Sequence, residues 1–200
     1  GPAIVANAGY TFTGWEPVLA ETVTDNVTYV AQYTEEGNVT IFYTVDPTNG
    51  DGGTVSRIDE SLPPATGEAK GSTATAKTGW KFTGWTLANS ATVLTTENAL
   101  TPAKGDVNGS AIWTERTYVA HFERTTAELT VEKQWLGDEG YTDNRVPVTL
   151  TIGREVNGAE EDWNTTVELS AENAQSGNAN VWQKKLPDAE THAENGTPYT

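Results

Sequence analysis

The sequence contains no cysteine and no methionine. Without cysteine no disulfide can form, so if the chain works outside the cell its small domains need another source of stability. Without methionine there is no initiator residue, so we expect the chain to begin inside a longer protein or to have been processed. We expect any export signal to lie outside these 200 residues.

Basic residues are scarce, with 12 Lys and Arg against 28 Asp and Glu, which gives a formal net charge of −16. Nucleic acid and anionic membrane surfaces repel such a field, so neither is an expected partner. No apolar run approaches the roughly 20 residues that a membrane-spanning helix needs. We therefore expect no membrane insertion in this segment, and the charge favours solubility in a salty exterior.

The residues that are present favour β-structure. Seven Trp, seven Tyr and four Phe can anchor small cores, and Thr and Val are abundant. Apolar residues alternate in five stretches, and long Gly- and Asn-rich breakers separate them. We predict an all-β or β-rich chain with no long helix; the five stretches are "TYVAQY", "VTIFYTV", "TYVAHF", "LTVEKQW" and "VPVTLTI".

One motif occurs twice. "GYTFTGW" at 9–15 returns as "GWKFTGW" at 79–85, and the strands "TYVAQY" and "TYVAHF" follow them. The second copy has a longer connection, which we interpret as an insertion at 86–116, and a front half that the first copy lacks. Residues 1–36 thus correspond to the C-terminal half of a unit and residues 37–126 to a complete one.

These motifs resemble the internalin-type B repeat, also called the Listeria–Bacteroides repeat, and its divergent relatives. The resemblance covers residues 1–124 and rests on the G-aromatic-x-F-T-G-W motif followed by an aromatic-Ala-aromatic strand. It implies small β-grasp-like modules of the kind that form stalks in cell-surface proteins of Gram-positive bacteria. It also implies attachment of the parent protein to the cell wall.

Residues 127–200 carry a different pattern: "VEKQW", an acidic loop ending in "NRVPVTLTI", then "VWQKKLP" and "GTPYT". This pattern resembles the collagen-adhesin B-type domain, known as Cna B. The resemblance implies a prealbumin-like β-sandwich whose last strand would follow Thr200. Together the two resemblances predict monomeric modules arranged as beads on a string in an adhesin.

Lys133 is the first candidate site residue. Alternation places it on the same face as Leu129, Val131 and Trp135, which we expect to point inward. A buried amine without a partner tends to lose its proton and become a nucleophile, although a lysine at a sheet edge can instead extend its head to solvent. The Cna B resemblance implies that this lysine forms an isopeptide bond with an Asn on the last strand, which these residues do not include.

The repeated aromatic residues are the second candidate. Trp15, Trp85, Trp80 and Tyr10 are possible ligand-facing residues that would stack on a sugar ring. The alternative is that the Phe and Trp of each motif fill a small core, while Gly14 and Gly84 supply a bend. We favour the second interpretation, because small domains need their aromatic residues inside.

Signals for catalysis are missing from the sequence. The two histidines, His121 and His192, have no metal-ligand spacing, and no nucleophile or phosphate-loop motif occurs. The acidic loops 46–53 and 136–145 are weak calcium candidates that do not fit an EF-hand. We expect neither enzyme activity nor a cofactor or metal. The predicted function is a stalk that presents a distal binding domain to a host matrix protein or glycan. The alternative is a carbohydrate- or matrix-binding module that uses the aromatic residues or the insertion.

Overall fold

The structure is a computed structural model that describes residues 4–22, 24–49, 52–138 and 141–200. It divides the chain into two compact units: residues 1–76 with 82–122, and residues 77–81 with 123–200. The described residues contain sixteen strands and three single-turn 3₁₀ helices. The prediction of an all-β chain is confirmed. No helix among these residues is long and apolar enough to cross a membrane.

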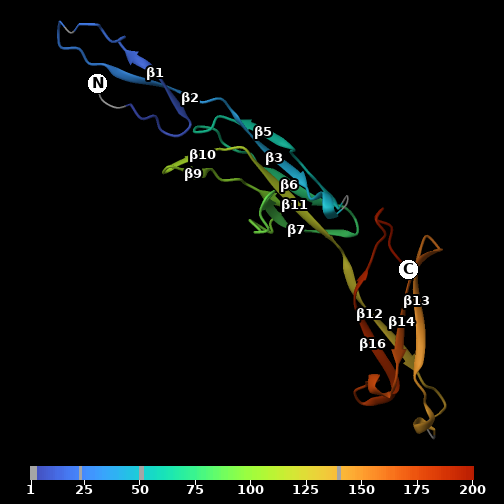
Figure 1. The fold of residues 1–200 in the computed structure, drawn as a ribbon. Helices are drawn as coiled ribbons and strands as arrows, with labels where there is room; N and C mark the ends of the chain where they lie inside the picture. Colours follow the sequence, from blue (N-terminus) through green and yellow to red (C-terminus); the bar gives the residue numbers. More distant parts are fainter. Residues whose placement is uncertain (1–3, 23, 50–51, 139–140) are drawn as a thin grey trace. The chain divides into compact units, whose positions relative to one another are not determined.

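The first unit contains four small sheets (Figure 1). The largest has the strand order β5-β3-β11-β7, and the strands β4-β6-β8 form a second sheet. The pairs β1-β2 and β9-β10 are hairpins. The strands are β1 (Tyr10–Glu16), β2 (Val30–Glu35), β3 (Val39–Val45), β4 (Gly53–Val55), β5 (Asp59–Leu62), β6 (Ser72–Ala76), β7 (Trp80–Leu87), β8 (Ala99–Leu100), β9 (Gly105–Val107), β10 (Ser110–Ile112) and β11 (Arg116–Arg124).

The centre of the largest sheet is a parallel pair, β3 with β11, in which Tyr43 lies opposite Tyr118. Strand β3 is "VTIFYTV", and its alternation holds: Ile41 and Tyr43 are buried, whereas the Phe42 side chain is 39% exposed. The Tyr43 ring stacks on Tyr118 at 5.8 Å and meets Trp85 edge-on at 6.2 Å. The core of the first unit is therefore aromatic and lies on one face of this sheet.

The insertion at 86–116 contributes to this core. The main chain of Trp85 exchanges hydrogen bonds with its residues, donating to the Thr95 carbonyl at 2.9 Å and accepting from the Leu94 amide at 2.7 Å. The indole Nε1 of Trp85 donates to the carbonyl of Asn98 at 3.1 Å. The segment 94–98 thus satisfies the polar groups of a tryptophan whose exposed fraction is 0%.

The second unit has two main sheets, β12-β16-β15 and β13-β14. Val167, Leu169 and Trp182 are its buried centre, and half-buried residues of β12 and β13 pack around them. Each sheet thus contributes one face to a shared core. The division of the chain at residues 36 and 126 stays a prediction. The strands are β12 (Thr126–Gln134), β13 (Val148–Val156), β14 (Ala159–Leu169), β15 (Ala174–Gln175) and β16 (Asn178–Glu190); the 3₁₀ turns are η1 (Pro47–Asn49), η2 (Thr142–Asn144) and η3 (Ala171–Asn173).

Gly53 provides a test of this packing. A methyl group at Gly53 would fall against the Phe122 ring and 2.6 Å from the carbonyl oxygen of Thr75. We expect Gly53→Ala to reduce the free energy of unfolding of the first unit by about 2 kcal/mol, as overpacking does. Gly37 has no atom within 4 Å of such a methyl group. Gly37→Ala should change stability by less than about 0.5 kcal/mol. Urea denaturation followed by amide resonances of the first unit measures both, and equal effects would contradict this packing.

Candidate functional site

The two copies of the repeated motif have the same local geometry. The rings of Phe12 and Trp15 meet edge-on at 5.8 Å, and those of Phe82 and Trp85 at 6.0 Å. The glycine before each tryptophan has a positive φ, 146° at Gly14 and 154° at Gly84. A bulge follows Phe12 in the first copy, because the pairing with β2 shifts between Phe12 and Gly14. The predicted bend before each tryptophan is present in both copies.

The second copy uses its aromatic residues as core. Trp85 is 0% exposed, and Phe82 meets Phe122 edge-on at 5.6 Å. The expectation that Trp85 faces a ligand is therefore wrong, because covering strands and the segment 94–98 leave no ring face open. The favoured interpretation, that Phe and Trp fill a small core, describes this copy.

The other three candidate aromatic residues are half-buried. Tyr10 and Trp15 lie on β1. Trp80 lies at the start of β7, where the guanidinium of Arg124 stacks on its ring at 5.0 Å. Cation–π stacking of this kind occupies a face that a sugar would need. A ligand-facing role for Tyr10, Trp15 and Trp80 stays a prediction.

A buried carboxylate, Glu60 on β5, connects the aromatic core of the first unit to the segment directly before β6. It is 8% exposed and accepts hydrogen bonds from the Tyr43 hydroxyl and from the amides of Lys70 and Gly71. Burial acts to raise the pKa of Glu60, but the three hydrogen bonds outweigh it and hold the pKa below its ordinary value. Burial also raises the pKa of Tyr43, which keeps the phenol protonated as the donor. Sequence reasoning missed Glu60, although alternation with Leu62 in "ESL" was a usable signal.

A second polar chain links three segments of the same unit. The Nδ1 of His121 lies 2.8 Å from the Oδ2 of Asp46, and its Nε2 lies 2.9 Å from the Thr86 hydroxyl. The Asp46 carboxylate also accepts from the amide and hydroxyl of Thr48. These two bonds, followed by the contact with His121, hold the pKa of Asp46 below its ordinary value. The side chains come from β11, from β7 and from the residue after β3.

The order carboxylate, imidazole, hydroxyl also occurs in hydrolases, where the hydroxyl must be accessible to substrate. Here Thr86 is 5% exposed within strand β7, so its hydroxyl is closed to a substrate. The arrangement instead satisfies three polar groups at the end of the largest sheet and fixes β7, β11 and the end of β3 to one another.

Lys133 is half-buried on β12, on the same side as Val131 and Trp135. Its Nζ lies 4.7 Å from the centre of the Trp135 ring and donates to the carbonyl of Gln134 at 2.8 Å. The guanidinium of Arg145 lies 5.3 Å from the same ring. The indole Nε1 of Trp135 is buried and has no hydrogen-bond partner among the described residues. Isopeptide formation at Lys133 stays a prediction.

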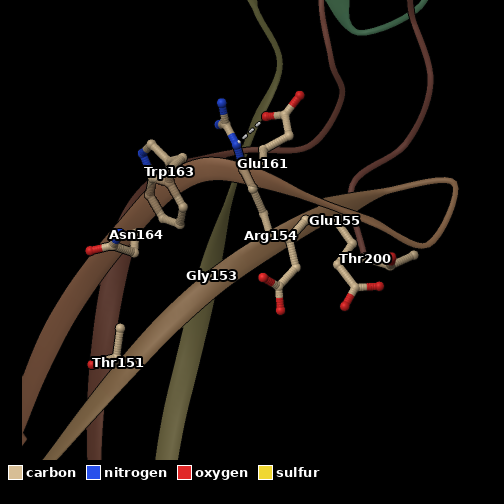
Figure 2. A pocket seen from close by; sticks show the side chains of 9 residues that line it. Thr151, Gly153, Arg154, Glu155, Glu161, Trp163, Asn164 and Thr200 are labelled. Atoms are coloured by element: carbon tan, nitrogen blue, oxygen red, sulfur yellow. Dashed lines mark hydrogen bonds and ion pairs between the residues drawn. The ribbon is translucent and has the colours of Figure 1, made fainter.

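Strands β13 and β14 border an open hollow of about 610 Å³, shown in Figure 2. Arg154 extends across it and donates to Glu161 at 2.8 Å and to Glu190 at 3.2 Å. Its guanidinium also stacks on Tyr199 at 4.1 Å and on Trp163 at 5.0 Å. Sequence analysis did not identify this cluster. Because its cation is paired twice and stacked twice, we interpret it as a tie between strands.

The weak calcium candidates fall partly outside the described residues, since 50–51 and 139–140 are not included. In the loop 46–53, Asp46 is engaged by Thr48 and His121. In the loop 136–145, Asp138 accepts two hydrogen bonds from Arg145 at 2.8 Å. Across the described part of the chain no three His, Asp or Glu side chains converge as a metal site would require.

Comparison with protein families gives one match: residues 43–126 match the family model described as "Divergent InlB B-repeat domain". The match supports the internalin B-repeat part of the resemblance and covers most of the first unit's larger sheets. Comparisons with curated proteins and with solved structures give no match.

Asp46 leads to a prediction about pH. Its pKa is lowered in the folded state, so its stabilising effect is complete above the unfolded value of about 3.9 and is lost as the pH falls through the lower, folded value. We expect Asp46→Asn to reduce the free energy of unfolding by about 1 kcal/mol at pH 7. The difference from the wild type should shrink as the pH falls below about 4.

The measurement is urea denaturation of the first unit at several pH values, followed by its amide resonances. Asp59→Asn is the matched control, because Asp59 is exposed on β5 of the same unit. It should change stability little at any pH. A constant difference between Asp46→Asn and the wild type from pH 7 to pH 2 would contradict the assignment.

Proposed function

We propose that this chain is a non-enzymatic stalk segment of a bacterial cell-surface adhesin, which holds a distal binding domain away from the cell wall. The parent protein would be extracellular and attached to the wall, and its ligand, a host matrix protein or glycan, would bind to other domains. The family match supports the coarser part of this proposal, because domains of this type are typical of surface proteins.

The observation that carries the proposal is the parallel pairing of β3 with β11. These strands stand at the two ends of the matched module, and their pairing runs from Ile41 with Arg116 to Val45 with Ala120. A force applied where the chain enters β3 and leaves β11 pulls the two strands along each other. All hydrogen bonds between them are then loaded together, which is the mechanically resistant arrangement. A stalk module needs this property, whereas a binding module does not.

The second unit fits the same role. Its two-sheet core around Val167, Leu169 and Trp182 supports the Cna B-like sandwich that the sequence resemblance implies. In that role the second unit is the next bead of the stalk. Each unit buries tryptophan in its core, Trp85 in the first and Trp182 in the second, and neither contains cysteine, so packing and buried hydrogen bonds supply the stability.

The alternative, a carbohydrate- or matrix-binding module, has less support. Trp85 is buried, and the insertion that would form the binding surface packs its segment 94–98 on that tryptophan. The chain's acidity and internal repetition favour neither role over the other.

Single-molecule pulling tests the stalk role. The chain has no cysteine, so paired cysteine substitutions define the attachment points cleanly. Handles at Asn38→Cys and Glu123→Cys load β3 and β11 in shear. Handles at Asn38→Cys and Glu115→Cys, at the same end of the pair, peel the strands apart one bond at a time.

We expect the shear pair to unfold at roughly twofold higher force or more, because forced unfolding reports the unfolding barrier along the pulled direction. Unfolding of residues 39–122, which lie between the shear handles, should release about 280 Å of chain. The peeling pair shares one handle and the same fold, so it controls for stability. Equal forces in the two geometries would remove the mechanical argument for a stalk.

A further inference from the structure

The first hairpin, β1 with β2, is a structural duplicate of the β7–β11 half of the complete module. Phe12 pairs with Tyr33, and their rings meet at 5.7 Å and 68°; the equivalent Phe82 and Phe122 meet at 5.6 Å and 66°. The sequence aligns "TYVAQY" with "TYVAHF", so Ala31 corresponds to Ala120. The two halves therefore present the same face, built from equivalent residues.

In the complete module this face is covered. Strand β3 pairs in parallel with β11 and stacks Tyr43 on Tyr118. Strand β4 brings Gly53 against the ring of Phe122. As a result Ala120 is 0% exposed and Phe122 is 1% exposed. The front half of the module, residues 39–76, supplies these covering strands.

In the first hairpin the same face is open. Tyr33 is 42% exposed, and Tyr29, Ala31 and Trp15 are half-buried. The equivalents of Trp15 and Tyr29 in the complete module, Trp85 and Tyr118, are only 0% and 4% exposed. Within the described part of the chain, β2 pairs only with β1, so its other edge is free for hydrogen bonding.

We propose that the free edge of β2 and the aromatic face of this hairpin are a docking surface for the front half of another repeat module. The partner's first strand lies parallel to β2, as β3 lies parallel to β11. Because Tyr43 pairs with Tyr118, and Tyr118 corresponds to Tyr29, the partner places an aromatic ring over Tyr29 and Trp15. This is strand addition, in which main-chain bonds give affinity and alternate side chains give specificity.

The internal duplicate identifies the partner's chemistry. The strand that pairs beside the equivalent face is "VTIFYTV", with Ile41 and Tyr43 facing inward and Phe42, which lies between them, facing out. The docked segment is therefore an extended strand with an aromatic residue at the position of Tyr43. The inference goes beyond the stalk role and does not depend on it, because it concerns the β1–β2 hairpin and not the parallel pairing of β3 with β11.

The experiment adds a synthetic, fluorescently labelled peptide of residues 38–76 to the full 200-residue chain and follows binding by fluorescence anisotropy. We expect saturable binding to the wild type. Ala31→Glu places a charge beneath the docked strand and should weaken binding at least tenfold. Gln32→Glu adds the same charge on the other face of β2, where Gln32 is exposed, and should change binding less than twofold.

A second arm keeps the protein unchanged, so that misfolding of a variant cannot explain a loss. The same peptide with Tyr43→Ala should bind the wild type at least tenfold more weakly. Equal binding of both peptides would overturn the proposed register. Binding that Ala31→Glu leaves unchanged would place the peptide elsewhere, such as on the complete module by strand exchange. Self-association of the wild type that Ala31→Glu abolishes, without peptide binding, would identify a second copy instead and overturn the proposed partner.

Discussion

The parallel contact between β3 and β11 is the constraint on which the first unit depends. It joins residues near 43 to residues near 118. The other two strands of the largest sheet pair on either side of it, β5 with β3 and β7 with β11. The stacked rings of Tyr43 and Tyr118 lie across this contact, with Trp85 edge-on beside them. Without that pairing the β7–β11 half would be an open two-stranded hairpin, which is marginal in water by itself. The β1–β2 hairpin shows what such a half looks like.

Buried polar groups secure the ends of this contact. Glu60 accepts hydrogen bonds from the Tyr43 hydroxyl and from two main-chain amides. Asp46 and His121 tie the end of β3 to β11 and, through Thr86, to β7. A buried carboxylate with all its bonds made specifies one arrangement of strands, since any shift in register leaves it unsatisfied. The charge pattern of the sequence gives no hint of this role, because most of its acidic residues are on the surface.

Much of the fold could be predicted from local patterns. Alternation identified strands such as "VTIFYTV" and "LTVEKQW", and the duplicated motif identified equivalent halves with the same bend at Gly14 and Gly84. Local patterns do not report which distant strand becomes a neighbour, so the parallel β3–β11 pair was not foreseen. The short strand β5, which carries Glu60, has no alternating stretch of apolar residues and was not among the predicted strands. The sequence identifies the insertion at 86–116 but not that its segment 94–98 covers Trp85, because main-chain hydrogen bonding to a buried residue leaves no sequence signature.

The strand order β5-β3-β11-β7 also bears on how the module is made. β11 is the last of these four strands to leave the ribosome, and it takes the place between β3 and β7. Until it emerges, β3 and β7 have no strand between them, and Tyr43 lacks the Tyr118 ring on which it stacks. Strands so distant in sequence pair slowly, because closing the loop between them costs conformational entropy before the hydrogen bonds of the pair form. The largest sheet is thus completed only when nearly the whole module has been synthesised.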